Sequence, residues 1–264
     1  MIPEQFFEMV QKADPSWHAV LTKGLQSVIA ADPLYLQDLA GSAFLPTDGR
    51  LFAAFTLPLG RVRYVLVGEG PYPRAESATG VCFMDGAVGS LWSAGGLSKA
   101  VNRATSLRNF MKMLLVSAGQ LHPDRTAGDA LAGIAARALA PASPFIQTLT
   151  ELQHNLTANG FLLLNAALAF RKDVPPLKEA RGWQPFLTTV LTALAQNFNT
   201  DQTTTQEQAL PTLVLWGKVA GQIEAMKIAR HFPKAIAEHP YNLTFITNKS
   251  MQSLFGPMAL LNVI

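Results

Sequence analysis

Four short apolar runs, each closed by Gly, Pro or a polar turn residue, constrain the fold of this chain most strongly. They extend from Val62 to Val67, Phe161 to Leu164, Thr212 to Leu215 and Ala235 to Ala237. Their length and apolar content are typical of buried strands. Segments with helical spacing lie between them, and strands that alternate with helices form parallel sheets with right-handed crossovers. The sequence therefore predicts an α/β fold with a four-stranded parallel sheet.

Apolar periodicity predicts helices in the first forty residues, where Phe6, Phe7 and Val10 share one stripe and Asp32-Pro33 ends the segment. Further helices are expected over residues 106–117, with Ser106 as N-cap, and over residues 183–195 and 218–229. The polar stretch 201–208 is expected to be a solvated loop, too short to link two domains. We predict one domain over residues 1–264, with residues 1–40 as its N-terminal helical part.

The composition indicates a globular protein without a metal or cofactor. Hydrophobic residues make up 49% and charged residues 15%, enough for a sizeable core. The formal net charge of +3 is only a mild preference for polyanions. Cys82 is the only cysteine, which rules out an internal disulfide and a thiolate metal cage, and the five histidines lack metal-ligand spacing.

The chain start, Met1-Ile2-Pro3-Glu4-Gln5, is polar and unlike a signal peptide. No apolar stretch approaches the roughly 20 residues that a membrane span needs. We therefore expect a cytoplasmic protein with no membrane partner.

Polar side chains follow three of the predicted strands. Glu69 and Tyr72 come after the first run, Asn165 after the second and His239 after the fourth. Ligands of parallel sheets bind beyond the carboxyl ends of the strands, which makes these residues candidates for a site. Each also has a purely structural interpretation, because any of them could simply complete a turn. A dinucleotide fingerprint is excluded at Gly68 and Gly70, since Pro71 follows and the third glycine is missing.

Seven motifs in order resemble those of the uracil-DNA glycosylase superfamily, and family 1 in particular. They are Leu51 to Phe55 with Pro58 and Arg61 to Arg63, Gly68 to Tyr72, Gly80 to Phe83, Ser106 to Asn109, Leu162 to Leu168, Gly182-Trp183 with Leu215 to Gly217, and His239-Pro240 with Leu243. Pro71-Tyr72-Pro73 and Thr79-Gly80-Val81 also resemble the poxvirus branch, whose members double as polymerase processivity factors. The resemblance implies a single-domain α/β/α sandwich that acts as a monomer on uracil-containing DNA.

The resemblance also implies a role for each candidate residue. In the pocket, Asn165 would read the uracil edge, Phe83 would stack on the base, and Tyr72 would exclude the methyl group of thymine. The catalytic histidine would be His239. On the DNA side, Ser106 would contact a phosphate, Pro240 would shape the minor-groove loop, and Leu243 would wedge into the base stack.

The chain departs from the family pattern at specific positions. Gly70 stands where the family has the aspartate that positions water, and Glu69, one residue earlier, is a candidate surrogate base. Glu76 and Asp85 are further acids on the neighbouring loops. Tyr241-Asn242 replaces the usual Ser-Pro after His-Pro, and an added stretch from Asp85 to Lys99 precedes the serine motif.

Three functional hypotheses follow. The chain could be a uracil-DNA glycosylase of reduced activity that acts on single- or double-stranded DNA in base excision repair. It could instead be a catalytically silent protein that binds DNA, or a replication or repair protein, on a glycosylase scaffold. The third hypothesis is excision of a base other than uracil, although Tyr72 argues against bulky 5-substituted pyrimidines.

Overall fold

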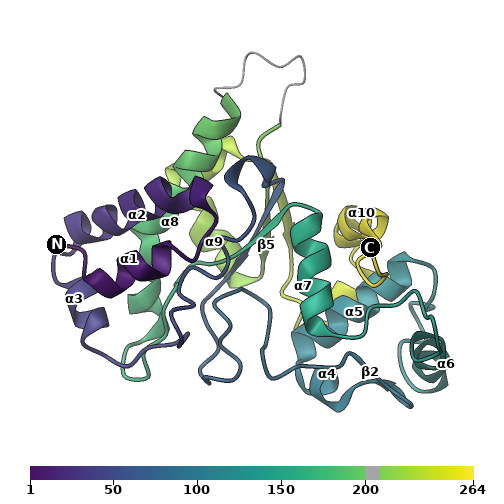
Figure 1. Cartoon of the computed structure of the whole chain (residues 1–264). Coiled ribbons are helices and arrows are strands. Elements are labelled where there is room, and N and C mark those ends of the chain that lie inside the picture. The colour runs from purple at the N-terminus through teal and green to yellow at the C-terminus, as the bar shows by residue number, and fades with distance from the viewer. Residues whose placement is uncertain (200–208) are drawn as a thin grey trace. The chain divides into compact units, whose positions relative to one another are not determined.

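The structure is a computed structural model that describes residues 1–199 and 209–264, shown as a ribbon in Figure 1. The chain forms two compact units. Unit 1 consists of Met1–Met84, Gly160–Leu215 and Val219–Lys234, and unit 2 of Asp85–Asn159, Trp216–Lys218 and Ala235–Ile264. The predicted loop over residues 201–208 lies outside the described residues, and a single domain over the whole chain stays a prediction.

Each of the two units contains its own set of helices. Those of unit 1 are α1 (Glu4–Val10), α2 (His18–Ala31), α3 (Tyr35–Ala40), α8 (Pro176–Asn199) and α9 (Lys218–Glu224), the last of which begins at the unit boundary. Those of unit 2 are α4 (Lys99–Arg103), α5 (Thr105–Ser117), α6 (Asp129–Ala138), α7 (Leu149–Ala158) and α10 (Lys249–Phe255). No helix in the described part of the chain is long and apolar enough to cross a membrane.

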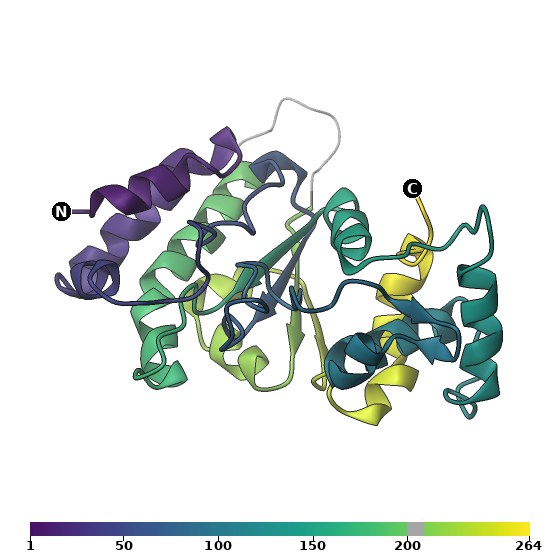
Figure 2. The ribbon, with the colours of Figure 1, turned by 60° about the horizontal axis from the view of Figure 1, so that its bottom comes forward.

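The central sheet has four strands in the order β4 (Phe161–Asn165), β1 (Tyr64–Gly68), β5 (Thr212–Trp216) and β6 (Lys234–Ala237) (Figure 2). Strand β1 runs parallel to both of its neighbours, with Val65 opposite Leu162 on one side and Leu213 on the other. Strand β4 is buried along its whole length, whereas β6 is only partly buried, with Ile236 exposed. The predicted α/β fold with a four-stranded parallel sheet is confirmed.

The helical start of the chain agrees with the prediction in its main features. Helix α2 ends at Ala31, and the Asp32 carboxylate then accepts a hydrogen bond from the Leu34 N–H at 3.1 Å, which turns the chain away from the helix. Phe6 and Val10 are buried on α1 as expected. The prediction that Phe7 shares this stripe is wrong, because Phe7 lies on the outer face of the helix and is exposed.

Four helix boundaries also differ from those predicted. Helix α8 begins at Pro176 instead of Trp183, continues through Pro185 and ends at Asn199 instead of residue 195. Helix α9 ends at Glu224, and a separate 3-10 helix spans Lys227–His231. Ser106 is not the N-cap of α5. The helix already begins at Thr105, so that Ala104 is the cap and Ser106 lies in the first turn.

Helices α2 and α8 pack closely within unit 1, side by side in both ribbon views (Figures 1 and 2). Gly24 of α2 makes this approach possible, because a Cβ there would lie 2.6 Å from the Phe186 ring of α8. The Phe186 ring in turn stacks on Phe52 and meets the edge of Trp183. The aromatic cluster therefore fixes how these two helices sit on each other.

A buried polar cluster anchors the N-terminal half of α8. The Glu179 carboxylate accepts hydrogen bonds from the Tyr35 hydroxyl and, at 2.5 Å, from Arg171 Nε. The Arg171 guanidinium also lies 5.2 Å from the centre of the Tyr35 ring. Burial, followed by the contact with Glu179, raises the pKa of Tyr35, so its hydroxyl stays protonated. The cluster ties α3, the segment after β4 and α8 together.

The core of unit 2 is built around α5. Phe110 of α5 packs against Trp216 and Phe255, and the Trp216 ring also meets Phe245 edge-on. The segment 85–99, which the sequence marks as an insertion, contains the antiparallel strands β2 (Trp92–Ser93) and β3 (Gly96–Leu97), and β3 contacts α6. Its structure is therefore a short hairpin packed within unit 2.

We expect Gly24→Ala to destabilise the protein by about 1 kcal/mol or more. Overpacking against Phe186 outweighs the roughly 1 kcal/mol that alanine gains in a helix. Gly221→Ala on α9 is the matched control, because no atom lies within 4 Å of its added Cβ, and it should stabilise by about 0.5–1 kcal/mol. Urea unfolding of both variants checks this, and a Gly24→Ala protein as stable as Gly221→Ala would contradict it.

We also expect a pH-dependent contribution from Glu151, the capping-box carboxylate of α7. It accepts hydrogen bonds from Gln147 N, Thr148 N and Thr148 Oγ1. The Thr148 hydroxyl foremost lowers the pKa of Glu151 below its ordinary value of 4.5. The stabilisation is therefore present above 4.5 and is lost as the pH falls through the lowered pKa.

Unfolding of wild type and Glu151→Ala at neutral pH, and again well below pH 4.5, measures this contribution. The variant should cost about 1 kcal/mol at neutral pH, and the difference should shrink in acid. A difference that grows on acidification would refute the assignment.

Candidate active site

The carboxyl edge of β1 and β4 brings two of the predicted motifs together in unit 1. Beyond the strand ends the pairing continues, with Ala166 N–H donating to the Gly68 carbonyl at 2.8 Å and Ala167 N–H to the Glu69 carbonyl at 3.0 Å. Residues 68–70 therefore run beside residues 165–167. This arrangement follows from the parallel register, in which Gly68 lies opposite Asn165.

Asn165 ends β4 and is only 4% exposed. Its side-chain amide makes no hydrogen bond to another residue in the described part of the chain, although buried amides are normally paired. Gly68 permits its position, because a Cβ on Gly68 would lie 2.7 Å from Asn165 Oδ1 and 2.9 Å from the Cβ of Cys82. Asn165 thus offers one donor and one acceptor group for a ligand.

Phe83 is held in an unusual backbone conformation. Its φ of 68° lies in the left-handed region, which is a genuine outlier for a bulky side chain and stores strain. The Thr79 hydroxyl closes the turn by donating to the Met84 carbonyl at 2.9 Å and accepting from the Val81 N–H at 3.2 Å. The neighbouring Cys82 N–H donates to the Leu163 carbonyl of β4 at 3.1 Å. The half-buried Phe83 is therefore fixed relative to the sheet.

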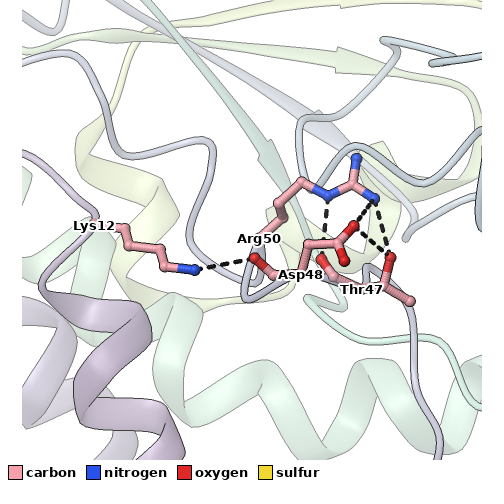
Figure 3. A network of polar contacts seen from close by, with 4 residues as sticks. All are labelled: Lys12, Thr47, Asp48 and Arg50. Carbon is pink, nitrogen blue, oxygen red and sulfur yellow. Dashed lines mark hydrogen bonds and ion pairs between the residues drawn. The ribbon is translucent and has the colours of Figure 1, made fainter.

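A polar network on the preceding loop supports this turn (Figure 3). Arg50 donates through Nε to the Thr47 carbonyl at 3.1 Å and through a terminal nitrogen to Asp48 Oδ2 at 3.2 Å. Lys12 Nζ donates to the Asp48 carbonyl at 3.0 Å. The Arg50 carbonyl packs so closely on Gly80, which has a φ of 83°, that an added Cβ would lie 2.1 Å from it. The network therefore positions the segment that carries Phe83.

The loop after β1 carries three of the predicted residues. Glu69 and Gly70 are exposed, and Tyr72 is partly buried. The Glu69 carboxylate has no hydrogen bond to a described residue. A Cβ on Gly70 would lie 3.5 Å from the Ala167 Cβ and 3.6 Å from its carbonyl, ordinary contact distances, and the backbone there is not left-handed. An aspartate side chain therefore has room at this position.

His239 lies after β6, in unit 2, with its imidazole oriented by the backbone. Nδ1 accepts a hydrogen bond from the Tyr241 N–H at 3.1 Å, so the neutral ring carries its proton on Nε2. Gly217, with a φ of 64°, gives the ring its space, because a Cβ there would lie 2.8 Å from His239 Cβ. Nε2 is thereby assigned as the donor of the ring.

The loop that begins at His239 is fixed by a buried amide. Asn109 Nδ2 lies 2.7 Å from the Pro240 carbonyl, 3.2 Å from that of Tyr241 and 3.4 Å from that of Asn242. Asn248 Nδ2 donates to Glu238 at 2.7 Å, immediately before the loop. Burial raises the pKa of Glu238, but the hydrogen bonds from Thr244, its own backbone and Asn248 together lower it by more, so the pKa lies below its ordinary value.

The other predicted residues of unit 2 differ in exposure. Pro240 is buried, Ser106 is partly buried in the first turn of α5, and Leu243 is 68% exposed at the start of a 3-10 helix, Leu243–Thr247.

Among the described residues, no cluster of three or more His, Cys, Asp or Glu could hold a metal.

Three residues that lie within the quoted motifs, Gly68, Gly217 and Asn109, have positioning roles that the sequence did not predict. The two glycines matter through what their missing Cβ leaves free, which depends on neighbours far apart in the sequence. Asn109 had a detectable signal, because it is a polar residue among Phe110, Met111 and other apolar side chains of a buried helix face.

A parallel sheet with polar side chains just beyond the carboxyl ends of its strands is the arrangement at which α/β proteins typically bind ligands. The chain is 37% identical to the wild-type UNG of Nitratifractor salsuginis, whose crystal structure it matches over 99% of this chain and 97% of that one, with a TM-score of 0.85. The uracil-DNA glycosylase of Mycobacterium avium is 24% identical over 232 residues, 88% of this chain and 82% of the relative. That of Corynebacterium efficiens is 26% identical over 231 residues, 87% of this chain and 77% of the relative.

No family model matches the chain. The similarity to the Nitratifractor protein nevertheless covers nearly the whole of both chains, and the chain belongs to the uracil-DNA glycosylase family. The resemblance predicted from the seven motifs is thereby confirmed.

We expect Gly70→Asp to fold normally, with a free energy of unfolding within about 0.5 kcal/mol of wild type. Its Cβ would meet Ala167 only at ordinary contact distances, and the position requires no left-handed backbone. Gly68→Ala, two residues away, should cost about 1–3 kcal/mol because its Cβ collides with Asn165 and Cys82. Parallel denaturant curves measure both, and equal losses would show that the space at Gly70 is not open.

Proposed function

We propose that this protein is a uracil-DNA glycosylase that flips uracil out of DNA and hydrolyses its N-glycosidic bond, at a rate reduced by the replacement of the family aspartate with Gly70. The proposal is supported by the membership of the chain in this family. A base inside a duplex is inaccessible to chemistry, so the nucleotide has to leave the stack and be read in a pocket.

The observation that carries this proposal is Asn165, which is only 4% exposed and whose side-chain amide has no hydrogen bond to another described residue. Its donor and acceptor match the edge of uracil, whereas cytosine presents a different pattern. Phe83 would supply a stacking face, an interaction typically worth about 1–3 kcal/mol per base. Tyr72 would occupy the space beside C5 and exclude the methyl group of thymine.

His239 and Glu69 are the proposed catalytic residues. When the bond between the sugar carbon and the base nitrogen breaks, its electron pair passes to uracil, and an oxygen of the base gains negative charge. His239 Nε2–H would donate to that oxygen, a contribution of about 10²–10³-fold. A water molecule would add its hydroxyl to the sugar and pass its proton to Glu69, which leaves free uracil and an abasic site.

The proposed DNA contacts are Ser106, Pro240 and Leu243. The N-cap of α5, Ala104, provides no side-chain cap, which leaves N–H groups beside Ser106 available for a phosphate. Leu243 is exposed, as a wedge between bases requires. The proposal takes the protein to be a single-domain monomer of the cytoplasm, acting in base excision repair on single- or double-stranded uracil-containing DNA.

Gly70 itself favours a second candidate function. Without the carboxylate, general-base assistance worth about 10²–10⁴-fold is lost unless Glu69 replaces it. The chain would then be a catalytically silent protein that binds DNA, or a replication or repair protein, through the glycosylase scaffold.

Single-turnover cleavage of a single-stranded uracil oligonucleotide, with protein in excess, tests both candidates. Wild type should yield abasic product. His239→Ala should slow it by about 10²–10³-fold, and Glu69→Gln and Asn165→Ala should also slow it. His122→Ala, a histidine that is 65% exposed, is the matched control and should leave the rate unchanged. Gly70→Asp should accelerate the reaction by up to about 10²–10⁴-fold.

The outcomes separate the candidates. Product from wild type that is lost in His239→Ala but kept in His122→Ala supports the enzyme. Product from Gly70→Asp alone means an intact pocket without chemistry and favours the silent binder. If neither protein yields product and neither binds DNA at low salt, both DNA functions are excluded.

A further inference from the structure

The loop from His239 to Leu243 presents two large exposed side chains. Tyr241 and Leu243 are each 68% exposed. The Tyr241 side chain makes no hydrogen bond and no ring contact with a described residue. Exposed apolar groups that are gathered on one element mark an interaction surface more often than isolated ones.

The backbone of this loop is fixed, so the two side chains are held in place. The Asn242 N–H donates to the His239 carbonyl at 2.9 Å, and the Phe245 N–H donates to the Asn242 carbonyl at 3.2 Å. The Asn109 side-chain amide donates to the carbonyls of residues 240–242, as described for the site. Binding through a rigid loop costs little conformational entropy, and a tyrosine side chain has only two torsions to order.

Positive charge lies on the helix that supports the loop. Arg108 Nε donates to Asn109 Oδ1 at 3.3 Å, which links this guanidinium to the loop through the same amide. Lys112, one turn further along α5, is only 9% exposed and has no ion-pair partner among the described residues. Burial, and then the neighbouring Arg108, lower the pKa of Lys112, an electrostatic cost that an anion would offset. This charge is complementary to a phosphate backbone.

The spacing of the two side chains suits stacked bases. Asn242 between them is extended, with φ −77° and ψ 138°, so residues 241 and 243 are roughly 6–7 Å apart along the chain. Successive bases in a strand are about 3.4 Å apart. Two neighbouring positions in a base stack therefore lie within reach of the pair.

We propose that Tyr241 is a second base-stacking residue, which packs its ring on the nucleobase next to the position that Leu243 occupies in DNA. The inference rests on the proposed function in so far as DNA is the partner. The aromatic ring supplies a sequence-tolerant face, and Arg108 and Lys112 hold the neighbouring phosphates.

Binding to a labelled duplex that contains a tetrahydrofuran abasic analogue tests the proposal without any chemical step. Tyr241→Ala should weaken binding between about fivefold and a hundredfold, while Tyr241→Phe should bind as wild type does. Leu139→Ala, an apolar side chain of unit 2 that is 48% exposed, is the matched control and should have no effect. A 2-aminopurine beside the analogue should show a fluorescence change on binding that Tyr241→Ala lacks. Near-identical thermal unfolding of the variants excludes a folding defect.

Each outcome decides one point. Unchanged binding by Tyr241→Ala overturns the proposal. Equal losses in Tyr241→Phe and Tyr241→Ala also overturn it, and assign the hydroxyl to a phosphate instead. A wild-type protein that binds no DNA at low salt overturns it together with any DNA function. The uracil cleavage assay is a separate readout, so a protein that stacks on DNA but releases no base would retain this inference and lose the proposed chemistry.

Discussion

Strand β1 is hydrogen-bonded on both sides in parallel register, to β4 and to β5, and the arrangement of unit 1 depends on this pairing. Parallel pairing places the carboxyl ends of neighbouring strands at the same edge, and here two further backbone hydrogen bonds extend the pairing beyond the end of β4. The loop after β1 and the segment after β4 are therefore aligned by backbone hydrogen bonds before any side chain contributes. The Gly70 backbone and the Asn165 side chain take their positions from that alignment.

Most of the fold could be predicted from the sequence, because buried parallel strands are short continuous apolar runs and their order along the chain fixes the class. Helix boundaries were harder to predict from the sequence. Residues 176–182 at the start of α8 are mostly charged or small, so no apolar period marks where the helix begins. Phe7 followed the helical period in sequence but not in burial, because tertiary packing decides which side of a short helix faces the core.

Part of the candidate site could also be predicted from the apolar runs. Asn165 and His239 follow two of these runs, where a ligand of a parallel sheet is expected. The contributions of Gly68, Gly217 and Asn109 could not be predicted, because each residue acts through a neighbour that only the folded chain brings close. The left-handed backbone of Phe83 is a similar case, since nothing in its local sequence requires it and only the surrounding contacts enforce it.

Cys82 gives the protein a built-in reporter. Its Sγ donates to the Leu66 carbonyl of β1 at 3.3 Å while its N–H is bonded to β4, and burial strongly raises the pKa of its thiol. A thiol in that state reacts only when the segment that carries it detaches from the sheet. Because the chain has no other cysteine, the rate of its modification measures this local opening without a second thiol signal.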